Sequence, residues 1–377
     1  MTGREAPPRL TWEQVLAWRM KRQWLSEPTT GTAVAVVRRL AGVQAQVSSA
    51  AVAAVALRQA NAQPGEIDRL LAERTLMRTW AMRGTLHLLA VEDAGAYLSL
   101  LAAARIWEKG SWQRTFLDAE NLNRLTGVVH ELLDRKVLSR EELVAAFVER
   151  TGDEAVGGKV RSGWGAVLKP LAWQGILCNA PSDGARVAFT RPDTWFPGWS
   201  GLPAVDEAAP VAVLSYLGAY GPASGATFDQ WLSRGASKTA SVRAWFAELG
   251  DRLAVVDVEG EKLFARREDV GDLVDAVPVN TIRLLPAFDQ YVLGPGTSDI
   301  RIIAAHRRPF ISKAAGWISP VVVSSGKVVG TWHVTDDRVE IELFREHGDI
   351  SAQALTPEVE RLASVSGTRY TMSVTTV

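Results

Sequence analysis

Gln44 and Gln46 are the two residues whose type and spacing point most directly to chemistry in this chain. They lie in the segment 42–47, in which apolar and polar residues alternate. Because side chains alternate across an extended strand, the segment predicts both amides on one side of the backbone and the apolar residues on the other. On a helix the two amides would diverge by about 200°. An extended conformation therefore allows a paired amide site, and a simple polar strand face is the alternative.

Other catalytic signatures are missing from the sequence. Its five histidines are not paired four residues apart, and no HExxH or carboxylate cluster accompanies them, so no metal site is predicted. There is no GxGxxG after a predicted strand, no GxxxxGK[ST] and no GxSxG. Cys178 is the single cysteine, which excludes an intramolecular disulfide, and its apolar neighbours predict a buried, inert thiol. We expect no cofactor.

The elements that must position the glutamines recur in a fixed order. In the clearest copy, Gly221-Pro222 breaks an apolar helix and Thr227 is expected to cap the next one. The predicted elements of this copy are helices ending near 219, 232 and 249 and strands over 253–258 and 262–266, joined at Glu259-Gly260. Three helices followed by a hairpin form the winged-helix arrangement.

Two further copies precede this one. In the middle copy, Ser139 and Glu142 predict a capping box, and Pro170 is expected to kink or shorten the last helix. Its predicted elements are helices over 121–135, 139–150 and 161–174 and strands over 176–180 and 186–190. The first copy is predicted to have helices over 12–25, 33–40, 48–59 and 66–74 and strands over 77–81 and 85–89. We therefore expect four domains: winged-helix units over 1–118, 119–205 and 206–276, with the two glutamines in the first, and a β-rich domain over 277–377.

The charges are balanced overall but clustered locally. The chain has 42 basic and 42 acidic side chains, whereas its first 120 residues have 15 basic and 11 acidic ones. This balance excludes a basic tail that coats nucleic acid, but it allows a local basic face. The candidates for DNA contact are Arg38, Arg39, Arg83, His87, Arg307, Arg308 and Lys313, the last three on a predicted basic hairpin. A solvated surface, or for His87 a place in the core, is the alternative. Asp289 is expected to cap a turn ahead of Gly294.

Three segments carry a resemblance to a known family: Val43–Val47, Arg78–His87 and Leu284–Gly294. Together with Ile318–Val323 and Val329–Trp332, they resemble the AlkZ-like family of winged-helix DNA glycosylases, in the form whose motif is glutamine, an aliphatic residue and glutamine. The resemblance covers nearly the whole chain in the expected order. It implies an α+β fold of tandem winged-helix units with a C-terminal β-barrel-like domain, which together form a C-shaped cradle for duplex DNA.

The resemblance implies a monofunctional DNA glycosylase that hydrolyses the N-glycosidic bond of alkylated, N7-substituted purines. Gln44 and Gln46 match the catalytic motif, and interstrand crosslinks are among the family's substrates. An N7-alkylated purine already has a positive charge, so its departure needs no strong acid. The two amide carbonyls would then hold water near C1′ and stabilise positive charge on the sugar. Such an enzyme serves DNA repair or self-resistance to an alkylating antibiotic.

The expected partner is double-stranded DNA that contains alkylated purines, and no membrane. No window approaches 18 consecutive apolar residues, so we expect a cytoplasmic protein. We also expect it to be a monomer and to associate with the nucleoid when it acts on DNA. Two alternatives remain from other classes of protein. One is a tandem winged-helix DNA-binding regulator without catalysis, and the other is a scaffold whose wings bind protein.

Overall fold

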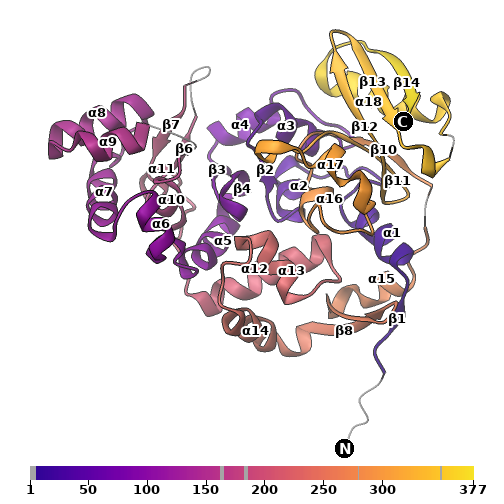
Figure 1. Cartoon of the computed structure of the whole chain (residues 1–377), viewed down its shortest axis with the longest axis horizontal. Coiled ribbons are helices and arrows are strands. Elements are labelled where there is room, and N and C mark those ends of the chain that lie inside the picture. Colours follow the sequence, from indigo (N-terminus) through magenta and orange to yellow (C-terminus); the bar gives the residue numbers. More distant parts are fainter. Residues whose placement is uncertain (1–5, 162–164, 182–185, 279, 349) are drawn as a thin grey trace, which may run out of the picture. The chain divides into compact units, whose positions relative to one another are not determined.

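The structure, a computed structural model, describes residues 6–161, 165–181, 186–278, 280–348 and 350–377 (Figure 1). The chain forms two compact units. Unit 1 comprises Met1–Glu66, Val213–Trp231 and Phe246–Val377, and unit 2 comprises Ile67–Ala212 and Leu232–Trp245. Unit 1 thus unites the beginning and the end of the chain. The division into four successive domains stays a prediction.

The N-terminal helices of unit 1 begin where the sequence predicts. They are α1 (Trp12–Arg22), α2 (Ala33–Arg39) and α3 (Ser48–Ala56). Thr11 caps α1 in a capping box with Gln14, and Thr32 caps α2. The first two helices end slightly earlier than predicted because Trp24 and Ala41 take left-handed backbone conformations, with φ of 54° and 51°.

The order of three helices and a hairpin that the sequence predicts for the last of the three copies is present. Helices α12 (Val205–Tyr220), α13 (Gly225–Ser233) and α14 (Thr239–Glu248) precede strands β8 (Leu253–Val258) and β9 (Glu261–Arg266), and β1 (Arg9–Leu10) pairs parallel to β8. The turn at Glu259-Gly260 has φ of 50° and 92°, as a tight hairpin requires. The predicted Thr227 cap is wrong: Ser224 Oγ accepts from Thr227 N at 3.1 Å, because the helix already begins at Gly225.

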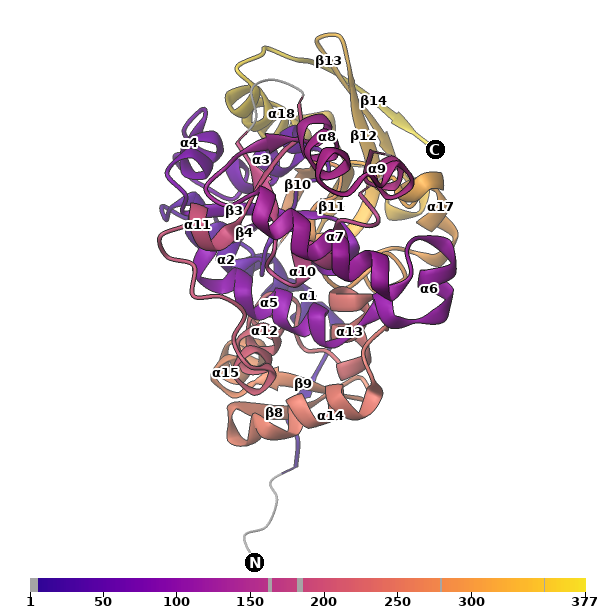
Figure 2. The same cartoon turned by 90° about the vertical axis from the view of Figure 1, so that its left-hand side faces the viewer.

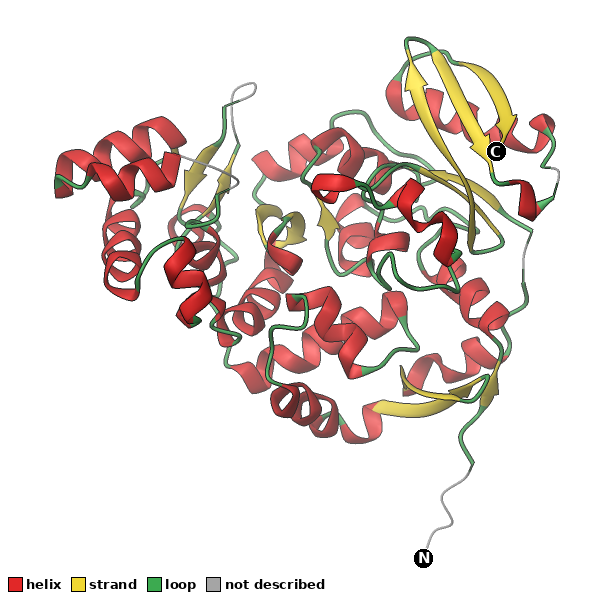
Figure 3. Ribbon diagram, in the orientation of Figure 1, coloured by secondary structure: helices red, strands yellow, loops and turns green. Residues whose placement is uncertain are grey.

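The C-terminal β region is an open sheet, so the predicted barrel-like domain is wrong. Its strands are β10 (Ile282–Leu285), β11 (Val321–Ser324), β12 (Lys327–Thr335), β13 (Arg338–Leu343) and β14 (Thr371–Thr376), paired in that order. The first four are antiparallel, whereas β14 returns parallel to β13 after helix α18 (Ala352–Ser366). Leu355, Val359 and Leu362 of α18 belong to the apolar core of this sheet. Figure 3 shows this helix beside the strands of the sheet. A helix thus covers the face that closure of a barrel would otherwise bury.

Unit 2 joins strands from the two earlier predicted hairpins in one sheet. Strands β4 (Leu86–Ala90), β3 (Leu76–Trp80), β6 (Cys178–Ala180), β7 (Ala188–Thr190) and β5 (Leu138–Ser139) are neighbours in that order. Its helices include α5 (Val91–Ala103), α7 (Ala119–Leu132), α8 (Arg140–Thr151), α9 (Glu154–Arg161) and α10 (Lys169–Trp173). Figure 2 shows α7, α8 and α9 together, and their apolar residues share one core.

Two local predictions in unit 2 have different outcomes. The Ser139–Glu142 capping box is confirmed. The single helix predicted over 161–174 is wrong, since α9 ends at Arg161 and α10 begins at Lys169. Pro170 stands in the first turn of α10, where a missing N–H costs no helical hydrogen bond.

The remaining helices are short. They are α4 (Glu66–Ala72), α6 (Gly110–Thr115), α11 (Pro192–Trp195), α15 (Val270–Val274), α16 (Gln290–Leu293) and α17 (Arg308–Ile311), and the strand β2 (Val43–Gln44) completes the elements that the site requires. Of the described helices, none combines the length and the apolar character needed to cross a membrane.

Candidate active site

A tight turn places the glutamine segment directly after α2. Ala41 N donates to Arg38 O at 3.0 Å and Gly42 N donates to Val37 O at 2.9 Å, which closes the end of the helix. Gly42 has a φ of 98°, a conformation that side-chain-bearing residues rarely adopt. The hydroxyl of buried Tyr220 donates to Leu40 O at 2.5 Å, so the start of the turn is anchored to α12.

The extended strand is shorter than the alternation predicts. β2 contains only Val43 and Gln44, and the chain bends at Gln46 before α3 begins. Val43 and Ala45 are buried as predicted. The two amides lie at different depths, because Gln44 is buried with 6% of its surface exposed, whereas Gln46 is exposed. The helix start at Ser48 leaves no room for a longer strand, and the pairing of the two amides in catalysis stays a prediction.

A buried ion pair fixes the far end of α3. Arg58 donates to both carboxylate oxygens of Asp289, at 2.8 and 2.7 Å, and both side chains are 0% exposed. Arg58 Nη1 also donates to Ala54 O at 2.7 Å, which satisfies the last turn of the helix. Because α3 starts two residues after Gln46, this bidentate contact holds the helix that follows the candidate catalytic residues.

Asp289 caps a helix, as the sequence predicts, in addition to its ion pair with Arg58. Its Oδ1 accepts from Tyr291 N at 2.8 Å and so caps α16. The Tyr291 hydroxyl in turn donates to Gly326 O at 2.7 Å, in the turn between β11 and β12. Sequence reasoning missed Arg58. The signal available in the sequence was an arginine two residues after the apolar helix 48–56. A charged side chain that becomes buried there needs a partner of opposite charge.

Arg83 and His87 belong to the β3–β4 hairpin of unit 2. Arg83 is half-buried in the turn and has a φ of 58°. His87 is 0% exposed and its Nδ1–H donates to Thr85 O at 2.9 Å, so the ring has no surface to offer a phosphate. Burial lowers the pKa of His87 to about 3, and the charge of Arg83 adds to this effect. The core position that the sequence left open for His87 is the one observed.

We expect His87 to make the protein less stable in mild acid. The unfolded ring titrates near pH 6.5, whereas the folded ring stays neutral down to about pH 3. Below pH 6.5 the unfolded chain therefore binds a proton that the folded chain does not, and stability falls as the pH falls. This contribution reaches about 2 kcal/mol at pH 5. Urea unfolding at pH 7.5 and 5.0 should show a smaller acid loss in His87→Gln than in the unaltered protein, and equal losses would contradict this.

The other basic candidates lie in unit 1 in different settings. Arg307 and Arg308 lie in short helical turns and Lys313 precedes another, so the predicted basic hairpin is wrong. Pro309 is the second residue of α17 (Arg308–Ile311), and without an N–H it cannot donate a strand hydrogen bond. Arg307 donates to both oxygens of Glu346, at 2.8 and 2.7 Å, and this contact lowers the pKa of the Glu346 carboxyl. Its charge is therefore already paired, whereas Arg308 and Lys313 are exposed.

Arg38 and Arg39 end α2 next to the glutamine turn. Arg38 is exposed. Arg39 lies 4.4 Å from the ring centre of Trp24 and donates to Arg22 O at 3.1 Å. Burial, together with the charges of Arg22 and Arg266, lowers the pKa of Arg39 to about 10. Arg39 therefore helps to hold α2 in place, and Arg38 is the one turned to solvent.

The described residues offer neither a reactive cysteine nor a metal-binding cluster. Cys178 is buried, and burial raises the pKa of its thiol, as the sequence predicts. Within the described ranges, no group of three or more histidine, cysteine, aspartate or glutamate side chains is arranged to hold a metal ion.

Known proteins resemble this chain over nearly its whole length. A family model described as DNA glycosylase AlkZ-like matches residues 37–365. A protein of Streptomyces sahachiroi named interstrand DNA cross-link repair glycosylase is 46% identical over 359 residues, which cover 95% of this chain and 97% of that protein. The solved structure of Streptomyces sahachiroi DNA glycosylase AlkZ has a TM-score of 0.94 and 45% identity, covering 97% of this chain and 100% of that one. The chain therefore belongs to the DNA glycosylase AlkZ-like family and is an enzyme of that class.

Proposed function

We propose that this enzyme hydrolyses the N-glycosidic bond of N7-alkylated purines in double-stranded DNA and thereby unhooks interstrand crosslinks. The observation that carries the proposal is the Gln44-Ala45-Gln46 segment, held between the capped end of α2 and the anchored helix α3. The near full-length relative named as an interstrand cross-link repair glycosylase supports the choice of lesion.

The chemistry needs little more than these amides. An N7-alkylated purine leaves as a neutral base, because its positive charge is present before the bond breaks. The sugar then develops positive charge at C1′, toward which an amide carbonyl can direct its negative end. A water molecule held by the second carbonyl would form a bond to C1′ as the bond to the base breaks and would release its proton to the solvent, giving an abasic site and the free base. Gln44 and Gln46 share these two roles in our proposal.

Selectivity for cationic lesions follows from the same argument. Glutamine has no accessible pKa and cannot protonate a neutral purine as it leaves. We therefore infer that unmodified guanine and adenine are not substrates. Removal of such lesions would serve DNA repair or self-resistance, in a monomeric cytoplasmic protein that joins the nucleoid when it acts.

The test is base release from a duplex that contains one N7-methylguanine. We expect free N7-methylguanine and an alkali-labile abasic site, and no release from the same duplex with guanine at that position. No strand cleavage should occur before alkali, because the proposed enzyme is monofunctional. Salt-dependent binding without base release would instead favour the DNA-binding regulator, and neither binding nor release would favour the scaffold.

A further inference from the structure

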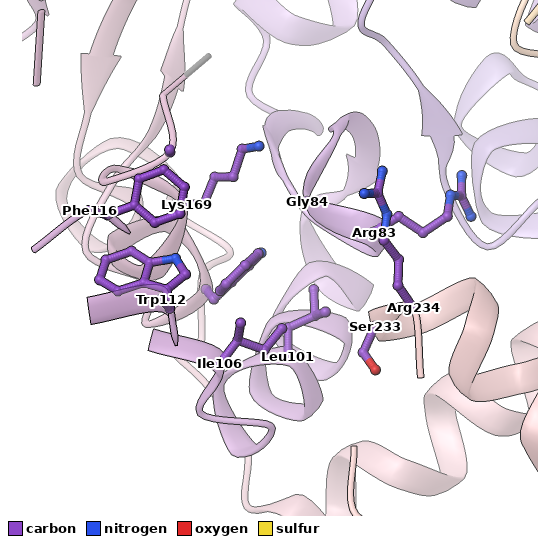
Figure 4. A pocket seen from close by; sticks show the side chains of 11 residues that line it. Arg83, Gly84, Leu101, Ile106, Trp112, Phe116, Lys169, Ser233 and Arg234 are labelled. Atoms are coloured by element: carbon purple, nitrogen blue, oxygen red, sulfur yellow. The ribbon is translucent and has the colours of Figure 1, made fainter. Parts of the chain in front are cut away.

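A pocket in unit 2 combines aromatic walls with cationic side chains. Its volume is about 170 Å³. Figure 4 shows the rings of Trp112 and Phe116 on one side and Arg83 with Arg234 on the other, with the turn at Gly84 between them. Lys169 and Trp173 also line it, and among the described residues no carboxylate does.

The β3–β4 turn is shaped to reach this pocket. Arg83 and Gly84 take left-handed conformations in succession, with φ of 58° and 69°. A Cβ on Gly84 would lie 3.5 Å from Lys169 Cδ and 3.6 Å from the Trp173 ring, so the turn packs against α10. A left-handed arginine is strained, and such strain persists where the surrounding structure enforces it. The backbone thus holds Arg83 at the edge of the pocket.

The aromatic wall is held by its neighbours. Trp173 stacks on Trp107, with 6.2 Å between the ring centres. The ring centres of Trp112 and Phe116 are 5.1 Å apart. Trp107, Trp112 and Phe116 are only partly buried where they pack on the core of unit 2. Rings that are fixed at one face and partly open at another can accept a planar group without being ordered first.

Two cationic side chains at the pocket, Lys169 and Arg234, can bind an anion. Within the described part of the chain, neither Lys169 nor Arg234 takes part in an ion pair. Burial lowers the pKa of Lys169, and the charge of Arg234 lowers it further. A bound phosphate would relieve this repulsion. The pocket therefore has cationic side chains without a carboxylate partner among its described lining residues, and it has the partly exposed rings of Trp112 and Phe116.

We propose that this pocket binds one unstacked nucleotide of the DNA substrate, with the base against Trp112 and Phe116 and its phosphate at Lys169 and Arg234. The inference rests on the DNA substrate of the proposed function. About 170 Å³ is smaller than the roughly 300 Å³ at which pockets for drug-sized ligands begin, so it suits one planar group. Stacking of a base on an aromatic side chain contributes about 1–3 kcal/mol. Gln44 and Gln46 are not among the described residues that line the pocket.

Undamaged DNA tests the proposal independently of base release. The dissociation constants of three labelled duplexes are compared: fully paired, with one bulged nucleotide, and with an abasic residue at the bulge. We expect the bulged duplex to bind roughly tenfold more tightly than the paired one, and the abasic bulge to lose that preference. The comparison between the bulged base and the abasic bulge uses the unaltered protein, so a folding defect cannot affect its result. Failure of the N7-methylguanine assay would leave these measurements unaffected.

Variants of the lining residues test whether the preference for the bulged duplex arises at this pocket. Trp112→Leu should reduce the preference for the bulge to less than about threefold while paired DNA binds as before. Lys169→Gln and Arg234→Gln should each lower the salt dependence of binding by about one phosphate contact. Lys238→Gln, at an exposed lysine of unit 2 outside the pocket, is the control and should keep the bulge preference. Thermal unfolding checks that each variant folds.

Three results would overturn the proposal. The first is an abasic bulge that binds as tightly as the bulged base. The second is a Lys169→Gln variant that behaves as Lys238→Gln does. The third is free deoxyguanosine monophosphate binding more tightly than the bulged duplex, which would identify a site for soluble nucleotides instead of DNA.

Discussion

Replacing the amide of Gln44 or Gln46 should lower single-turnover release of N7-methylguanine by roughly 10²–10³-fold, as the loss of one preorganised dipole at a developing charge does in other enzymes. Gln44→Met suits the buried position because it keeps most of the side-chain volume, and Gln46→Ala suits the exposed one. The affinity for undamaged duplex should change little, since neither amide carries a charge that neutralises phosphate.

Gln63→Ala is the matched control for this experiment. Gln63 is an exposed glutamine of unit 1, and its side-chain amide donates to the backbone carbonyl of the nearby Asn61, at 3.2 Å. Its loss should leave both base release and unfolding unchanged. Unaltered single-turnover rates in both motif variants would remove the catalytic assignment, and a large fall in DNA affinity would turn it into a binding role.

Local patterns predicted the helices and hairpins well, because caps and breakers act within a few residues. The Ser139–Glu142 capping box and the Glu259-Gly260 turn are confirmed at the predicted positions. The predictions were wrong where a tertiary contact or the start of a helix overrides the local sequence pattern. The segment after Gln44 alternates like a strand, but α3 begins at Ser48 and the chain must bend first.

Contacts between distant segments escaped sequence reasoning. The resemblance implied a barrel, but the path of the chain after β13, through α18 and back to a parallel β14, leaves the sheet open. Arg58 and Asp289 are 231 residues apart, and neither position alone identifies the other. The unit 2 pocket likewise needs Arg83, Lys169 and Arg234 from three separate parts of the chain. The glutamine motif could be located from sequence, whereas the contacts that support it could not.

Breaking the Arg58–Asp289 pair should destabilise unit 1 by about 3–5 kcal/mol, because it leaves one charge buried without its partner. Asp289→Asn is the most informative change, since the amide oxygen can still accept from Tyr291 N and cap α16. At about 2–4 °C per kcal/mol, the midpoint of thermal unfolding should fall by roughly 10 °C. Base release below that midpoint should slow as well, because α3 would lose the contact that holds its end.

A double variant separates the cost of the unpaired charge from the loss of the contact itself. Arg58→Met with Asp289→Asn removes both charges, so it should be more stable than Asp289→Asn alone. The exposed pair Arg69–Glu73, whose side chains are 57% and 47% exposed, is the reference. Glu73→Gln there should shift stability by less than about 1 kcal/mol. If Asp289→Asn were no more disruptive than Glu73→Gln, the buried pair would not be what anchors α3 behind the glutamine segment.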